Sequence, residues 1–181
     1  MRLFTAVPVP SPARDELVSL LQRLRETGLP VRWVREQGLH ITLKFFGEVG
    51  EDSISRLTEA LARAAAGTGS IPITCHGFGA FPTLTRARVI WVGAAAPAAL
   101  ELLQDGIERA CEPLGFPSEG RPFHPHITLG RVREGERVPA EVIEGLESSE
   151  VPFLADRLVL YRSQPGRGGS VYDVVHTIPL A

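Results

Sequence analysis

The chain of 181 residues is long enough for one sizeable hydrophobic core, and 44% of its residues are hydrophobic, as in an ordinary globular protein. The formal net charge of −2 excludes a global attraction to nucleic acid or to an anionic membrane, so any polyanion has to meet a local basic patch. Cys75 and Cys111 lack the paired spacing of a zinc knuckle or a disulfide framework. With no signal-peptide pattern and no long apolar segment, we expect a cytoplasmic protein that does not associate with membranes.

The first half of the chain predicts a strand, a helix, two strands and a second helix. Alternation predicts a strand over residues 2–7. Ser11 is expected to cap a helix that has Pro12 at its first position, and a leucine stripe continues until Gly28. Residues 31–34 and 39–46 are predicted to be strands, and a helix is predicted from about residue 52 that ends before Gly67.

The second half repeats this order. Residues 71–78 and 88–92 predict strands, which residues 81–83 separate by breaking any regular element. A third helix is predicted because apolar residues recur at three-and-four spacing, at Leu100, Leu103, Ile107, Cys111 and Leu114. A strand over 124–132, a short helix over 140–146, and closing strands over 153–161 and 171–178 complete the chain, with a glycine-rich connection at 164–170.

The repeated order of elements predicts an α+β fold with two pseudo-symmetric lobes. Antiparallel sheets from the two lobes are expected to face a central cleft, with the helices outside. No low-complexity segment divides the halves, so we expect residues 1–181 to form a single two-lobed domain.

Each half contains one copy of the same tetrapeptide. His40-Ile41-Thr42-Leu43 and His126-Ile127-Thr128-Leu129 lie 86 positions apart in a chain that has five histidines. Because side chains alternate along a strand, each copy places its histidine and threonine on one face and its two aliphatic residues on the other. Two imidazoles from the two lobes could therefore share one cleft.

Such a pair suits a displacement at phosphorus. An imidazole has a reference pKa of about 6.5, so one ring can act as a neutral base while the other, beside an anion, acts as a protonated acid. The hydroxyls of Thr42 and Thr128 can orient the phosphate between the rings. Arg131, five residues after His126, is the candidate for stabilising the charge that builds in the transition state. This chemistry needs no metal and no cofactor.

The motifs and their surroundings resemble the 2H phosphoesterase superfamily, and more closely the RNA 2′,3′-cyclic phosphodiesterases, also called 2′-5′ RNA ligases. The segments that carry the resemblance span nearly the whole chain: Arg2-Leu3-Phe4, Arg32-Trp33-Val34, Leu39 to Gly47, Gly79-Ala80-Phe81-Pro82, Arg121 to Arg131, and Leu158 to Ser163.

The resemblance implies hydrolysis of RNA 2′,3′-cyclic phosphate ends, or of small cyclic nucleotides, to 2′-phosphomonoesters. We expect the protein to be a monomer. The resemblance also implies that His40 is the proton donor to the leaving 3′ oxygen and His126 the proton acceptor from water, with Thr42 and Thr128 on the phosphate. The older ligase name fits less well, because Lys44 is the sole lysine and no phosphate-binding glycine loop is apparent. Any 2′-5′ joining is expected to be minor and independent of ATP.

Several alternatives remain at this point. His124, His126 and His40 could instead hold a zinc ion, and the cleft could bind RNA ends without turnover or act on another cyclic nucleotide or an ADP-ribose cyclic phosphate. Phe4 could stack on a nucleobase or fill the core, with the core favoured. Arg131 could contact phosphate or be a surface residue, and the glycine-rich segment at 164–170 could cradle phosphate, although a hairpin loop is favoured.

Overall fold

A computed structural model describes residues 1–181 as four helices and nine strands, connected by short turns and loops. The helices are α1 (Ala13–Glu26), α2 (Ile54–Ala65), α3 (Ala98–Cys111) and α4 (Ala140–Glu144). The strands are β1 (Arg2–Pro8), β2 (Val31–Trp33), β3 (His40–Glu48), β4 (Ile71–Phe81), β5 (Val89–Ala95), β6 (His126–Val132), β7 (Val151–Ala155), β8 (Arg157–Gly166) and β9 (Gly169–Pro179).

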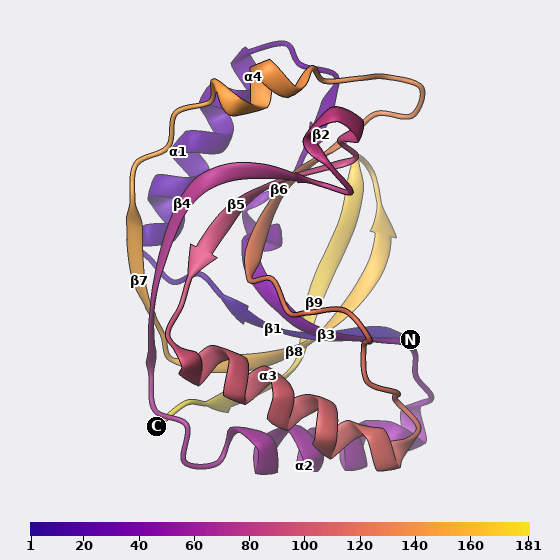
Figure 1. The fold of residues 1–181 in the computed structure, drawn as a ribbon. Coiled ribbons are helices and arrows are strands. Elements are labelled where there is room, and N and C mark those ends of the chain that lie inside the picture. The colour runs from indigo at the N-terminus through magenta and orange to yellow at the C-terminus, as the bar shows by residue number, and fades with distance from the viewer.

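The strands pair antiparallel in the order β7-β4-β5-β6-β3-β1-β8-β9, and β2 also pairs with β6. Two halves meet at the centre of this order, where β3 and β6 are joined at one register position, Ile41 opposite Ile127. The sheet curls strongly about this junction (Figure 1). The α+β prediction with two antiparallel lobes is thus confirmed, and the lobes are halves of one continuous path of strands.

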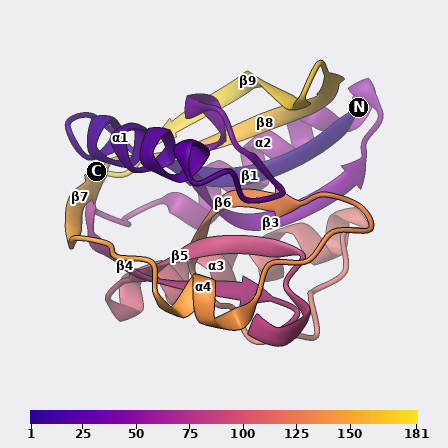
Figure 2. The same ribbon diagram turned by 90° about the horizontal axis from the view of Figure 1, so that it is seen from above.

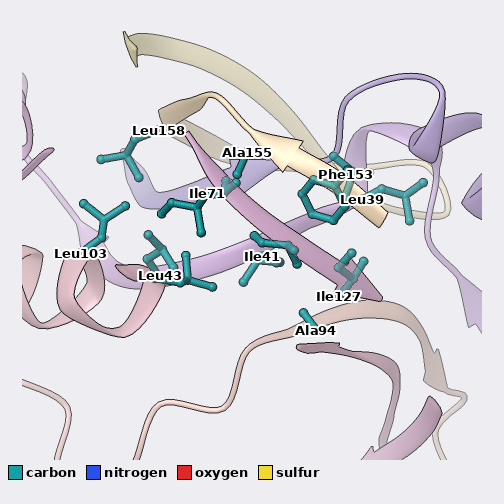
Figure 3. Close-up of a cluster of buried hydrophobic side chains, with 14 of the residues drawn as sticks. Leu39, Ile41, Leu43, Ile71, Ala94, Leu103, Ile127, Phe153, Ala155 and Leu158 are labelled. Carbon is teal, nitrogen blue, oxygen red and sulfur yellow. The ribbon is translucent and has the colours of Figure 1, made fainter. Parts of the chain in front are cut away.

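The helices cover one face of the central strands. α2 and α3 pack against each other, and α1 and α4 lie on opposite sides of β3 and β6 when the molecule is seen from above (Figure 2). The largest apolar cluster joins residues of α1, α2 and α3 to Ile41 and Ile127, both 0% exposed. Figure 3 shows part of this cluster, with Ile41, Ile127 and Leu103 of α3. Cys75 and Cys111 are free thiols within this cluster. None of the helices is both long and apolar enough to cross a membrane.

The predicted strand over 153–161 is wrong, because the structure divides it into two strands at Asp156. β7 pairs with β4 in one lobe, whereas β8 pairs with β1 in the other, so the chain changes lobes at this single residue. The apolar residues on either side of Asp156 concealed the break, since both strands bury apolar side chains and a short apolar run does not show which strand it pairs with.

The predicted cap of the first helix is also wrong. Pro12 occupies the N-cap position of α1, and no side chain caps the helix. Ser11 Oγ instead accepts a hydrogen bond from Arg14 Nη2 at 3.0 Å. The helix ends at Glu26, before Gly28, as the sequence predicts.

Candidate functional site

The two tetrapeptides open the two central strands. β3 begins at His40 and β6 begins at His126, and the isoleucine that follows each histidine pairs with its counterpart. Both isoleucines point into the apolar core against the helices. Because neighbouring side chains on a strand point to opposite faces, the histidine and threonine of both motifs share the other face, which we call the motif face. All four of these side chains are partly exposed.

The register indicates how the four polar groups are arranged. Counting from the Ile41–Ile127 pair, Thr42 lies opposite His126 and Thr128 lies opposite His40. The two histidines are therefore diagonal neighbours, which in antiparallel pairs are about 7–8 Å apart. Two hydrogen bonds to different oxygens of one phosphate can span such a separation. The fold thus brings His40, Thr42, His126 and Thr128 together on adjacent strands.

Aromatic rings surround His40. Phe4, Tyr172 and Tyr161 lie with ring centroids 5.0, 5.3 and 5.7 Å from the imidazole. Phe4 is only 2% exposed and belongs to a small cluster with Tyr161 on the motif face of β1 and β8. A side chain with so little free surface cannot stack on a nucleobase, so base stacking, one of the two roles that the sequence leaves open for Phe4, is wrong, and Phe4 instead packs beneath His40.

Burial controls the titration of His40. It lowers the pKa of His40 to about 4, an effect that the nearby backbone of Gln37 partly opposes and the charge of His126 reinforces. Nδ1 of His40 is buried and makes no hydrogen bond of normal geometry. In the free protein at neutral pH this ring is therefore neutral, and a nearby anion has to supply the interaction that protonates it.

His126 is held differently. Its Nδ1 lies 2.8 Å from the backbone oxygen of His124, and because a carbonyl can only accept, this nitrogen carries the proton and donates. Nε2 of the neutral ring is then left with a free lone pair, as a general base requires. Burial lowers the pKa of His126, and the hydrogen bond to His124 partly opposes that effect. The edge-on ring of Phe81, with its centroid 4.8 Å away, packs against the imidazole.

Matching bulges extend the motif face along both strands. In β6 the pairing with β5 skips Leu129, and in β3 the pairing with β1 skips Leu43. An extra residue reverses the alternation that follows it. Arg131 and Phe45, each five residues after its motif histidine, consequently return to the motif face, and both are exposed.

Phe45 is a site residue that the sequence interpretation missed. Its side chain is 62% exposed, although it contacts Phe4 at a centroid distance of 5.7 Å. An exposed aromatic ring next to a histidine site offers a stacking surface for a base. The only sequence signal was that Phe45 and Arg131 occupy equivalent positions after the two repeats.

The arrangement of His40, His124 and His126 does not suit the zinc site considered as an alternative. No three histidine, cysteine, aspartate or glutamate side chains come together in a way that could hold a metal ion. His124 packs against Trp91 at a centroid distance of 4.9 Å and lies 6.3 Å from His126 by the same measure. His40 and His126 therefore lack the third donor that a zinc site needs.

Lys44 is turned away from the motif face. It is 2% exposed, and its Nζ lies 2.5 Å from Oε2 of Glu108 on α3 and donates to the backbone oxygen of Pro117 at 2.8 Å. Gln104 donates a further hydrogen bond to the same carboxylate. The sole lysine is thus a buried structural cation, with no access to a nucleotide.

Comparison with known proteins identifies the family of this chain. The family model of the 2′-5′ RNA ligase superfamily matches residues 9–167. The RNA 2′,3′-cyclic phosphodiesterase of Thermotoga maritima is 32% identical over 176 residues, covering 97% of this chain and 94% of the relative. The enzyme of the same name from Geobacillus stearothermophilus is 35% identical over 179 residues, which cover 98% of this chain but only 56% of the relative.

Solved structures give the same result. The protein TT0787 of Thermus thermophilus superposes with a TM-score of 0.81 at 30% identity, covering 99% of this chain and 98% of that one. E. coli LigT complexed with 3′-AMP superposes with a TM-score of 0.79 at 27% identity, covering 99% and 97%. On the evidence of its fold, its repeated histidine strands and these matches, the chain belongs to the 2′-5′ RNA ligase superfamily.

Proposed function

We propose that this protein hydrolyses RNA 2′,3′-cyclic phosphodiester ends to 2′-phosphomonoesters by paired histidine acid–base catalysis. The observation that carries the proposal is the pairing of Ile41 with Ile127, from which both histidines and both threonines of the motifs share one face. The relatives named RNA 2′,3′-cyclic phosphodiesterase support the choice of substrate. The chain acts as a single two-lobed domain and as a monomer in this proposal.

The reaction balances with two proton transfers. Nε2 of His126 removes a proton from water as the water oxygen attacks phosphorus. The bond from phosphorus to the 3′ oxygen breaks, and His40 gives its proton to that oxygen, which leaves a 3′ hydroxyl and a 2′-phosphate. Thr42 and Thr128 hold the non-bridging oxygens, and Arg131 offsets the charge that develops on them.

Because the pKa of His40 is low in the free protein, His40 can act as an acid only after substrate has bound. In the free protein burial holds the pKa at about 4, so the ring carries no proton at neutral pH. The negative phosphate raises that pKa when it binds beside the ring, because an opposite charge favours the protonated form. Proton uptake on binding therefore prepares His40 for donation, while His126 keeps its Nδ1 proton on the His124 carbonyl and its Nε2 free.

Two side chains, Lys44 and His126, argue against the alternative functions. Turnover by two imidazoles requires no metal, and the buried Lys44 leaves no lysine for an adenylylated intermediate, so any 2′-5′ joining would be a minor, ATP-independent reaction. A protein that only bound RNA ends would need no hydrogen bond that fixes the tautomer of His126.

Product analysis of an oligonucleotide that ends in a 2′,3′-cyclic phosphate tests the proposal. We expect a 2′-phosphate in excess EDTA, and loss of about 10²–10⁴-fold in kcat for both His40→Ala and His126→Ala. His76→Ala, an exposed histidine on β4, is the matched control and should keep wild-type turnover. A 3′-phosphate product would reverse the donor and acceptor, and activity that zinc restores after EDTA would refute the metal-free mechanism.

A further inference from the structure

A hollow of about 340 Å³ opens beside the motif face, between the segment that follows β2, the strand β6 and the tip of the β8–β9 hairpin. Three arginines line it, Arg32, Arg35 and Arg131, and no acidic residue does. Arg32 and Arg35 have no part in the mechanism proposed above. The hollow thus concentrates positive charge on a protein whose net charge is −2.

The arginines remain without acidic partners. Arg32 and Arg131 lie directly opposite each other on β2 and β6, an arrangement in which like charges repel. None of the five ion pairs in the structure includes Arg32, Arg35 or Arg131. The nearest acid in sequence, Glu36, is paired with Arg14 at 3.0 Å. An anion in the hollow would relieve this repulsion, and phosphate suits the planar guanidinium fork.

The β8–β9 hairpin holds one side of the hollow. Its two-residue turn lies between Gly166 and Gly169, and Arg35 donates a hydrogen bond to the backbone oxygen of Arg167 in that turn. Gly168 has a φ of +81° and would place a Cβ 3.7 Å from the guanidinium of Arg35. The glycine-rich segment is thus a hairpin loop, as the sequence favours, and it also fixes Arg35 at the rim of the hollow.

The hollow is continuous with the proposed reaction site. Tyr172 lines it and also packs edge-on against His40 at a centroid distance of 5.3 Å. Gln37 lines it too, and its backbone influences the pKa of His40. On the other strand, Arg131 lies three residues beyond Thr128, about 10 Å along the strand at roughly 3.3 Å per residue. A ligand that places one phosphate between the histidines therefore extends its next phosphate toward the arginines.

From this continuity, and resting on the proposed function, we infer that Arg32 and Arg35 form a second phosphate subsite for the phosphodiester immediately 5′ of the terminal nucleotide, and that Arg131 lies between this subsite and the first phosphate. A chain that carries a cyclic phosphate at its 3′ end has such a phosphodiester, whereas a nucleoside 2′,3′-cyclic phosphate has none. The subsite makes oligonucleotide ends the preferred substrate class over cyclic mononucleotides.

Steady-state kinetics with two substrates tests the inference. We would compare cytidine 2′,3′-cyclic phosphate with a dinucleotide that ends in a 2′,3′-cyclic phosphate, and expect the dinucleotide to have the lower KM for the wild-type protein. Arg32→Gln and Arg35→Gln should each raise KM for the dinucleotide about tenfold, because a charge-assisted hydrogen bond contributes roughly 1.5 kcal/mol, and leave the mononucleotide unaffected. Arg56→Gln, an exposed arginine on α2, is the matched control.

The outcomes separate the two proposals. Equal KM values for both substrates, or equal losses on both in Arg32→Gln, would overturn the subsite while the proposed function stands. If the wild type hydrolyses neither substrate, the proposed function fails, and fluorescence anisotropy of a labelled cyclic-ended oligonucleotide decides the subsite. A wild-type affinity that Arg32→Gln lowers about tenfold and that salt weakens would support the subsite, and identical affinities would overturn it.

Discussion

Replacing Lys44 should destabilise the protein strongly while leaving its chemistry intact. In Lys44→Met, Glu108 keeps its charge at 6% exposure and retains only the hydrogen bond from Gln104 at 3.0 Å. Breaking a buried pair by removing one partner costs about 3–5 kcal/mol, which is a large part of a typical stability of roughly 5–15 kcal/mol. For a chain of 181 residues we expect Tm to fall by roughly 6–20 °C.

The double variant Lys44→Met/Glu108→Leu should recover most of this loss, because it buries no unpaired charge. Urea denaturation with an unchanged m value measures the free energy of unfolding for both variants and for the wild type. Arg109→Met is the matched control on α3, since its ion pair with Asp105 is exposed and such pairs contribute about 0.3–0.5 kcal/mol.

The refolded double variant should also hydrolyse the cyclic phosphate at the wild-type rate, because Lys44 points to the core and not to the motif face. A single variant as stable as Arg109→Met, or a double variant as unstable as the single one, would refute the reasoning on the buried pair. A stable double variant without hydrolytic activity would show that Lys44 takes part in the chemistry.

Further predictions concern the motif face. The pKa of His40 is about 4 in the folded chain and about 6.5 when unfolded, so the unfolded state binds more protons between these values. The contribution of neutral His40 to the free energy of unfolding should therefore be fully present above about pH 6.5 and be lost as the pH drops toward about 4. In thermal melts over this range, Tm should fall less for His40→Phe than for the wild type, and an equal fall in Tm would contradict the burial argument. The kcat/KM of the wild type should have a bell-shaped pH dependence with its maximum below about pH 6.5, because burial lowers the pKa of both imidazoles, and a plateau up to about pH 9 in a pH–rate profile would exclude two imidazoles. Thr42→Val and Thr128→Val should lower kcat by about 10-fold, less than either histidine change, because each removes one hydrogen bond to phosphate; a loss equal to that of His126→Ala would assign the threonine a larger role. Phe45→Ala should raise KM about 10-fold through lost base stacking and leave kcat unchanged, whereas Phe45→Tyr should keep the wild-type KM.

Much of the fold could be predicted from local pattern. The leucine stripe of α1 and the alternating burial of β3 and β6 follow directly from residue spacing, and the structure places these elements where the sequence predicts them. The lobe exchange at Asp156 could not be predicted, because periodicity describes which face of a strand is buried and not which strand it pairs with.

The site was predicted in part for a similar reason. The two tetrapeptides indicate their own faces, because each is a run of strict alternation. Strict alternation would place Arg131 on the same face as Ile127, and only the bulge at Leu129 returns it to the face of His126. The aromatic ring of Tyr172 comes from the distant β9, and no local pattern connects that strand with His40.

The passage of the chain from one lobe to the other at Asp156 also determines when the sheet can be completed during synthesis. β1 leaves the ribosome first, yet one of its two neighbours is β8, which begins at Arg157. A nascent chain therefore carries β1 with an unpaired edge until β8 has emerged, and an open edge is prone to pairing with other chains. Because the lobe of β3, β1, β8 and β9 is built from two segments far apart in the sequence, no continuous stretch of the gene encodes that lobe alone.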